Sequence, residues 1–273
     1  MVGTTMDIER FVGEVLADIA ASEAKFQTFK RRSTPDLPIP FFGRIDHATV
    51  LTVGVNPSDS EFEGREWPAT TDTPYLTDRL LGYFNHDVPP HPWFKTWESA
   101  LRLLGVSYES GVAAHLDISP RATIPMGQIT NVDLFLQMAR RDVKWLFKLL
   151  NGLRQPRLVL LAGCVTKKRY INHLLKECGP THSWRVLGEA QKTGSGRIGY
   201  HAFEAKGRLI PGFFCSISPS GNNKHLLLQR ISENIDQLQP IIARAHHGWI
   251  SDRNMLLTPL PSTPLATKHP AAD

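Results

Sequence analysis

The interpretation of the fold rests on Ala48–Val55 (ATVLTVGV), which Asn56-Pro57-Ser58 follows at once. Its apolar, β-branched side chains form an unbroken run, which is typical of a strand buried on both faces of a parallel sheet. The Asn-Pro-Ser tripeptide ends this run with turn-forming residues. The stretch therefore predicts an inner strand whose carboxyl end carries polar side chains.

Further strands alternate with helices along the chain. The other expected strand regions are Gly111–Ile118, Arg157–Ala162, and Tyr200–Phe203 with Leu209–Ile217, which a turn at Lys206-Gly207 connects. The expected helices are Met6–Arg31, Trp93–Leu104, Val132–Leu153 after an N-cap at Asn131, Val165–Lys176 and Asn222–Ala245. This alternation predicts a three-layer α/β/α fold around a central, mainly parallel sheet of about four strands.

Two segments are expected to be loops. Ser58–Arg79 is polar and aromatic, without a clear period. Gly194–Gly199 fits G-x-G-x-x-G, but we expect no strand before it and no helix after it. It is therefore not interpreted as a dinucleotide-binding motif.

Length and composition are those of a globular protein. The 273 residues include 41% hydrophobic and 21% charged residues, enough apolar material for a substantial core. We expect an N-terminal helix in residues 1–34, one α/β domain in residues 35–250 and a disordered tail in residues 251–273. No apolar run approaches the roughly 20 residues that span a bilayer, so we expect a cytoplasmic monomer without membrane contact.

The charge and the cysteines narrow the possible partners. A net charge of +5 and a pI near 9.2 suit a polyanion such as DNA, although many proteins without such a partner are equally basic. Cys164, Cys178 and Cys215 are too few for a four-cysteine zinc site or iron–sulfur cluster, and we expect buried free thiols. No histidine has a convincing set of metal-ligand neighbours, so we predict neither a metal nor a cofactor.

The residues that follow each strand are the candidates for a functional site, because ligands of parallel α/β folds bind outside the carboxyl ends of the strands. These strand ends are Asn56-Pro57-Ser58, Asp117-Ile118-Ser119, Gly163–Lys167 and Ser218–Asn223.

Two of these strand ends carry motifs that resemble those of a known family. Gly54-Val55-Asn56-Pro57-Ser58 resembles the first active-site motif of the uracil-DNA glycosylase superfamily, and Ser218-Pro219-Ser220-Gly221-Asn222 resembles the second motif of its mismatch-specific branch. Leu158–Cys164 resembles the family's third strand, and order and spacing agree over Pro38–Ala245. The resemblance implies a monofunctional DNA glycosylase, which flips a base out of DNA and hydrolyses its bond to the sugar, leaving an abasic site.

The resemblance also implies roles for individual residues. Asn56 matches the polar residue that positions the hydrolytic water or stabilises the leaving base. Ser218 stands where the uracil-specific branch has its catalytic histidine, and that branch's Asp and Tyr in the first motif are also absent here. Phe62 is placed like the aromatic residue that stacks on the flipped base. The loop that presses into the minor groove matches Ser218, Ser220, Gly221, Asn222 and Asn223.

Basic residues near these motifs are candidates for contacts with the DNA backbone. Lys224 and His225 directly follow the minor-groove loop. Lys167 lies at the start of the helix after the third strand, where a helix N-terminus and a cation together suit a phosphate. A solvated charged face is an equally good interpretation of the segment around Lys167.

Asp117 occupies the position at which the family usually reads the pyrimidine with asparagine. A carboxylate accepts a hydrogen bond from the exocyclic amine of cytosine but repels O4 of uracil. Ser58 and Ser60 are small where uracil-specific enzymes have a ring that blocks 5-substituents. We therefore predict excision of a 5-modified cytosine, with His115 on the same strand face as Asp117. Such bases occur in phage DNA, which suggests a role in defence.

Several alternatives stay open. The same fold serves a uracil or mismatch glycosylase in base excision repair, or a DNA-binding module with weak catalysis, an alternative that the serine at position 218 keeps open. A nucleotide or nucleoside hydrolase would lack the minor-groove loop. Asp117 is also a reasonable cap for the loop that follows it, and His115 a reasonable core histidine.

Overall fold

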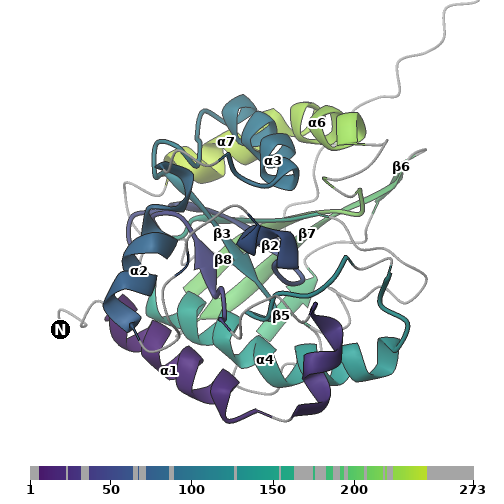
Figure 1. Ribbon diagram of the computed structural model, residues 1–273. Coiled ribbons are helices and arrows are strands. Elements are labelled where there is room, and N and C mark those ends of the chain that lie inside the picture. Colours follow the sequence, from purple (N-terminus) through teal and green to yellow (C-terminus); the bar gives the residue numbers. More distant parts are fainter. Residues whose placement is uncertain are drawn as a thin grey trace, which may run out of the picture.

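The computed structural model of the protein has a central β-sheet with helices on both sides (Figure 1). It describes residues 6–22, 24–31, 37–63, 67, 72–85, 89–125, 128–153, 155–162, 175, 183–186, 191–193, 196–205, 208–217, 219 and 224–244. The helices on one side of the sheet are α1 (Ile8–Ala20) and α4 (Val132–Gly152), and those on the other side are α3 (Pro92–Leu103), α6 (Lys224–Glu233) and α7 (Ile235–Arg244).

The sheet is mixed, with a parallel centre and antiparallel flanks. The central strands run in the order β3-β2-β4-β8. Their bounds are β2 (Val50–Gly54), β3 (Ala113–Asp117), β4 (Leu158–Ala162) and β8 (Arg208–Cys215). The antiparallel strands are β1 (Phe41–Phe42) beside β3, then β7 (Gly196–Ala205) beside β8, with β5 (Ser183–Val186) and β6 (Gln191–Thr193) pairing with β7.

The predicted strand regions are all present, but the prediction of a mainly parallel sheet of about four strands is wrong. The described part of the chain contributes eight strands, and four of their seven pairings are antiparallel. Ala205 of β7 pairs with Arg208 of β8, and a connection this short joins only antiparallel strands. β1 escaped prediction because it is two residues long.

The loop predicted over Gly194–Gly199 is wrong in its second half. β7 begins at Gly196, and β6 lies just before it. The conclusion that this segment is no dinucleotide-binding motif is unaffected, because a strand follows the glycines where that motif needs a helix.

The predictions for α3 and α4 agree with the structure to within one residue at each end. Asn131 caps α4 as expected, since its side-chain oxygen accepts a hydrogen bond from the Leu134 amide at 3.1 Å. The helix predicted over Asn222–Ala245 is two helices, α6 and α7, which are divided at Asn234. The predicted helix Val165–Lys176 lies outside the described residues, apart from Leu175, as does the tail at 251–273.

The N-terminal segment holds shorter helices than the sequence suggests. The long helix predicted over Met6–Arg31 ends at Ala20, and a 3-10 helix, η1 (Ala24–Phe29), follows it. Phe26 and Phe29 are buried on η1 at a spacing of three, which places them on one side of a 3-10 helix.

The loop predicted over Ser58–Arg79 contains two helices. A 3-10 helix, η2 (Asp59–Phe62), comes directly after the first motif. The helix α2 (Thr73–Leu81) begins at an Asp72 N-cap, whose side chain accepts a hydrogen bond from the Tyr75 amide. Its weak apolar periodicity explains why the sequence pattern did not reveal it.

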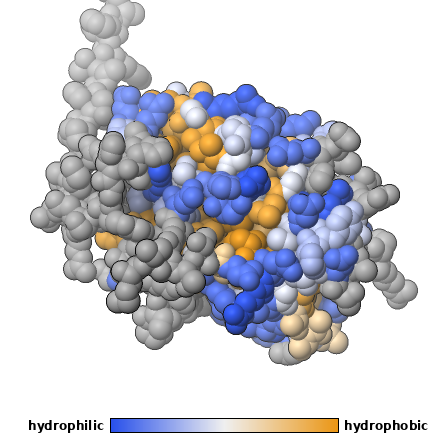
Figure 2. All heavy atoms as spheres, turned by 90° about the vertical axis from the view of Figure 1, so that its left-hand side faces the viewer, coloured by the Kyte–Doolittle hydropathy of each residue, from blue (hydrophilic) through white to orange (hydrophobic). Residues whose placement is uncertain are grey.

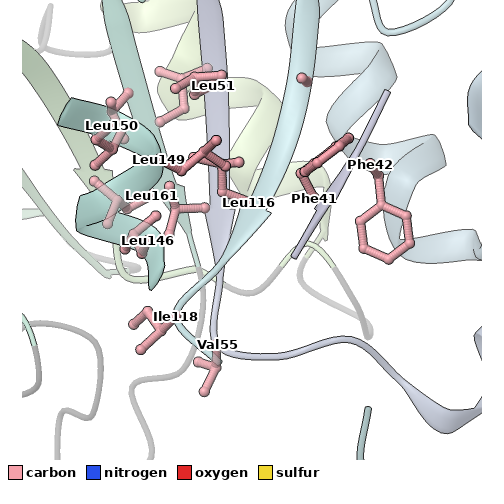
Figure 3. Close-up of a cluster of buried hydrophobic side chains, with 14 of the residues drawn as sticks. Phe41, Phe42, Leu51, Val55, Leu116, Ile118, Leu146, Leu149, Leu150 and Leu161 are labelled. Atoms are coloured by element: carbon pink, nitrogen blue, oxygen red, sulfur yellow. The ribbon is translucent and has the colours of Figure 1, made fainter. Parts of the chain in front are cut away.

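The core lies between α4 and the central strands. Alternate residues of a strand point to opposite faces, and the side chains of β2, β3 and β4 that face α4 are apolar. Figure 3 shows this cluster, in which the labelled leucines of α4 lie against those of the strands: Leu146, Leu149, Leu150, Leu51, Leu116 and Leu161. The same alternation turns Phe41 and Phe42 of β1 to opposite sides (Figure 3).

Figure 2 shows one face on which polar side chains surround a limited apolar area. No helix among the described residues combines the length and the apolar character that crossing a membrane requires.

Candidate active site

A cavity of about 330 Å³ lies at the carboxyl ends of β2 and β3. Asn56 and Asp117, which the sequence predicts at one site, both line it. Pro219 of the second motif lines it as well, although its partner in sequence, Ser218, lies outside the described residues. The cavity thus combines the first motif, the end of the second predicted strand and part of the second motif.

The segments that leave β2 and β3 stay side by side beneath the cavity. The amides of Ser119 and Thr123 donate to the carbonyls of Val55 and Pro57 at 2.9 and 3.0 Å. In return, the Asp59 amide donates to the Thr123 carbonyl at 2.8 Å. These backbone hydrogen bonds make the first motif an extension of the sheet, so its polar side chains are held in fixed positions.

Asn56 is half-buried, and its amide nitrogen is fully engaged. Nδ2 donates to the Pro57 carbonyl and to Thr123 Oγ1, both at 2.7 Å. Thr123 Oγ1 in turn donates to the Ile124 carbonyl at 2.9 Å. Two donor bonds fix the orientation of the carboxamide, so Oδ1 is the atom left to accept a hydrogen bond from a water or a ligand.

A buried ion-pair cluster anchors the same segment from the α4 side. Asp142 of α4 accepts hydrogen bonds from Ser119 Oγ at 2.7 Å and from Arg121 Nε at 2.9 Å. Arg141 reaches the other oxygen of Asp142 at 2.9 Å. Because the Asp142 carboxylate is fully buried, removing a partner would leave an uncompensated charge, which is strongly destabilising.

Asp117 and His115 point to the same face of β3, as the sequence predicts. His115 Nε2 lies 3.3 Å from Asp117 Oδ1, and both side chains are buried. Asp117 Oδ2 is also buried and has no hydrogen-bond partner among the described residues. An unsatisfied carboxylate oxygen in a cavity wall is an expected place for a ligand to bind.

Gly54 makes this arrangement possible. It pairs with Asp117 across β2 and β3, and a Cβ atom on Gly54 would lie 2.5 Å from Asp117 Oδ1 and 3.2 Å from the His115 ring. Only glycine leaves room for the carboxylate at this point, which gives a physical reason for the glycine of the first motif.

A second carboxylate, Glu61, lines the cavity without having been predicted from the sequence. Glu61 lies on η2, is buried, and accepts a hydrogen bond from the hydroxyl of Tyr83. Its backbone carbonyl accepts a hydrogen bond from Trp67 Nε1 at 3.0 Å. The signal was hidden because Glu61 stands in a segment that was interpreted as an exposed loop.

Ser58 also lines the cavity and begins η2. Its hydroxyl lies 2.7 Å from that of Ser60, and it accepts the Ser60 amide hydrogen bond that caps η2. Asp59 points away into an ion pair with Arg31, with 3.1 Å between Nε and Oδ2. Burial raises the pKa of Asp59, and the Arg31 charge counteracts this rise in part.

Phe62, predicted to stack on a base, is not brought into the cavity wall. Its ring is 5.2 Å from that of Trp67. The aromatic wall is formed instead by Phe42, Trp93 and Phe94. These residues come from β1 and the start of α3, and nothing in the sequence indicates that α3 covers this end of the sheet.

His91 is a further cavity residue that the sequence analysis set aside. It is the N-cap of α3, because Nδ1 accepts a hydrogen bond from the Trp93 amide at 3.2 Å. Burial lowers the pKa of His91, so its ring is neutral at neutral pH with the proton on Nε2.

The predicted DNA-contacting residues fall mostly outside the described residues. These are Lys167, Ser218, Ser220, Gly221, Asn222 and Asn223. Lys224 and His225 are described, and both are exposed at the start of α6. Their roles in DNA binding stay predictions.

The possible metal ligands form no site among the described residues. Within the described ranges, no three His, Cys, Asp or Glu side chains gather as a metal ion requires. Cys215 is a buried free thiol, as predicted, whereas Cys164 and Cys178 lie outside the described residues.

No protein-family model matches the chain, and no curated protein matches its sequence significantly.

Proposed function

We propose that the protein is a monofunctional DNA glycosylase that releases a 5-modified cytosine. The observation that carries the proposal is that Asn56, Asp117 and Pro219 line one cavity, although they come from the ends of three different strands. Asn56 and Pro219 belong to the two motifs that resemble the uracil-DNA glycosylase superfamily. A volume of about 330 Å³ suits one base with its substituent, since ligand cavities begin at about 300 Å³.

Hydrolysis of an N-glycosidic bond needs a water aimed at the anomeric carbon of the sugar. Asn56 supports this role because its Nδ2 is fixed by Pro57 and Thr123, so that Oδ1 accepts a hydrogen bond from the water. Glu61 is the second carboxylate that lines the cavity, beside Asp117. In its ionised form it accepts the proton that the water loses, a role worth about 10²–10⁴-fold in rate.

The base-reading role of Asp117 is supported by its unpartnered, buried Oδ2. That atom accepts a hydrogen bond from the N4 amine of a cytosine, whereas O4 of uracil or thymine would face it as a second acceptor. Ser58 lines the cavity with a small side chain, which leaves space for a 5-substituent. Lys224 and His225, exposed at the start of α6, contact the DNA backbone in this proposal.

The test is a base-release assay. Single- and double-stranded oligonucleotides carry one uracil, mismatched thymine, cytosine, 5-hydroxymethylcytosine or glucosylated 5-hydroxymethylcytosine, and alkali then cleaves any abasic site. We expect release of a modified cytosine. Asp117→Asn is expected to weaken this release by about 1–3 kcal/mol and to shift preference toward uracil, because the amide donates to O4. Asp78→Asn, on an exposed aspartate of α2, is the control.

Two outcomes would replace the proposal. Ready release of uracil, no reaction with any cytosine derivative and no effect of Asp117→Asn would make Asp117 a loop cap and the enzyme a uracil repair glycosylase. Binding of all oligonucleotides without release of any base would make the protein a DNA-binding module.

A further inference from the structure

A row of four buried polar groups runs along the α3-facing side of β2 and β3 and ends at the cavity. Tyr108 OH lies 2.5 Å from Thr52 Oγ1, and Thr52 Oγ1 lies 2.8 Å from His115 Nδ1. His115 Nε2 then lies 3.3 Å from Asp117 Oδ1. All four side chains are buried. No part of the base-release chemistry described above uses Tyr108 or Thr52.

The first hydrogen bond of this row has a fixed direction. Burial raises the pKa of Tyr108 well above its usual range, so its hydroxyl keeps its proton. Thr52 Oγ1 is the one acceptor that this hydroxyl meets among the described residues. A buried hydroxyl proton without an acceptor is strongly unfavourable. Tyr108 therefore donates to Thr52.

The direction of the second hydrogen bond follows from the first. Thr52 has a single hydroxyl proton, and with Tyr108 as the donor on one side, that proton is directed to His115 Nδ1. Nδ1 is then an acceptor, so the ring proton is on Nε2. On this side of the ring, Nε2 lies 3.3 Å from Asp117 Oδ1.

Three aromatic rings keep the imidazole in this orientation. The rings of Trp93, Phe94 and Phe42 surround that of His115 at centroid distances of 4.6, 5.2 and 5.8 Å. Gly54 packs against its other edge. A 180° ring flip would exchange Nδ1 with Cδ2 and Nε2 with Cε1, so C–H groups would face Thr52 and Asp117 and Thr52 would lose its acceptor.

We propose that Tyr108, Thr52 and His115 form a one-way donor chain that keeps Asp117 a hydrogen-bond acceptor, so that the cavity selects bases with an exocyclic amine. His115 Nε2 faces Oδ1 at 3.3 Å, and Oδ2, which has no described partner, accepts from the base. The three residues are positioning and specificity residues. The selectivity part of this inference rests on the proposed base-binding function, whereas the direction of the chain does not.

The experiment compares Thr52→Val, which removes the hydroxyl but keeps the shape, with Thr52→Ser, which keeps the hydroxyl. Nitrogen NMR on protein with ¹⁵N-labelled histidine reports the protonated ring nitrogen, and a His115→Gln variant assigns the signal. Free cytosine, free uracil and their 5-hydroxymethyl derivatives are titrated into each protein. Circular dichroism identifies any variant that fails to fold.

In the wild type we expect an unprotonated Nδ1 and a protonated Nε2. Thr52→Val is expected to mix the two tautomers and to reduce the preference for cytosine over uracil about tenfold, within the range of one base-edge contact. Thr52→Ser restores both. Tyr108→Phe removes the donor that fixes the direction of the Thr52 hydroxyl, so it is expected to shift the tautomer and the preference in the same direction as Thr52→Val, but by a smaller factor, because Thr52 can still donate to Nδ1.

A protonated Nδ1 in the wild type would overturn the chain, and so would a Thr52→Val protein with unchanged tautomer and base preference. Failure of the proposed function looks different. In that case no oligonucleotide loses a base, while the NMR signals still report the direction of the chain and the titrations still report the preference for an amine.

Discussion

The two faces of the same central strands differ in kind. On the α4 face, β2, β3 and β4 present Leu51, Leu116 and Leu161 to the leucines of α4 (Figure 3). On the opposite face, the intervening positions of β2 and β3 hold Thr52, His115 and Asp117, all buried. Neighbouring positions along one strand therefore belong to different layers, one of them purely apolar and the other hydrogen-bonded.

This difference separates stability from function. Apolar side chains stabilise the fold by burial and packing, and similar side chains can replace each other with modest losses. Buried polar groups stabilise only when their partners are complete, and Asp117 Oδ2 has none among the described residues. Ligand binding therefore explains the composition of the polar face better than folding stability does.

The largest expected effect is that of Asn56→Ala on base release. Loss of one positioned polar group at a reaction centre reduces turnover by about 10²–10³-fold. The two hydrogen bonds lost, to Pro57 and Thr123, lower stability by only about 1–2 kcal/mol, so folding and DNA binding persist. The measurement is single-turnover release from the preferred oligonucleotide, alongside thermal unfolding.

Two results would contradict this prediction. Unchanged turnover in Asn56→Ala would mean that another residue positions the water. Cleavage of the DNA strand without alkali would exclude a monofunctional mechanism.

Leu161→Ala tests the apolar face. Leu161 is fully buried against α4, so truncation is expected to lower the free energy of unfolding by about 2–5 kcal/mol. The preference among bases should not change, because the side chain points away from the cavity. Leu103→Ala, on a side chain that is 39% exposed, is the control and should alter stability by less than about 0.5 kcal/mol. A changed base preference in Leu161→Ala would show that the faces are not separable.

Gly54→Ala tests the contact between β2 and the polar face. The new methyl group would lie 2.5 Å from Asp117 Oδ1, so the carboxylate must move. We expect the free energy of unfolding to fall by about 1–3 kcal/mol and base recognition to be impaired. Gly212→Ala is the matched control in the same sheet, because its nearest neighbours are at 3.5 and 3.6 Å. It should be neutral or slightly stabilising. Urea unfolding and base-release assays on both variants decide the point.

The sequence was informative where one local pattern dominates. Apolar runs located β2, β3, β4 and β8, and the capping preference of asparagine located the start of α4 at Asn131. Of the antiparallel strands, β7 was predicted in part over Tyr200–Phe203, whereas β1, β5 and β6 were missed because pairing depends on partners distant in the chain. α2 was missed because its capping residue, Asp72, stands among residues that equally suit a loop.

The site was predictable in part for the same reason. Strand ends in a parallel sheet converge, so Asn56 and Asp117 were found from position alone. Glu61 and the Trp93 wall depend on how η2 and α3 fold back over the sheet, which no short pattern encodes. Phe62 lies next to Trp67 and outside the cavity lining, so its stacking role stays a prediction that position alone does not support.

The smallest expected effect comes from removing one methyl group on each face. Ile118→Val acts on the α4 side and Thr52→Ser on the polar side, and both positions are fully buried. Each deletion should lower the free energy of unfolding by about 1 kcal/mol, the usual result for one buried methyl group.

Thr52→Ser keeps the hydroxyl, so the NMR signals of His115 should stay as in the wild type. Equal losses in urea unfolding, with the His115 signals unchanged in both variants, would mean that the two faces pack alike and differ only in the hydroxyl. A loss in Thr52→Ser well above that in Ile118→Val would mean instead that the methyl group of Thr52 orients its own hydroxyl, and that packing and hydrogen bonding on the polar face are coupled.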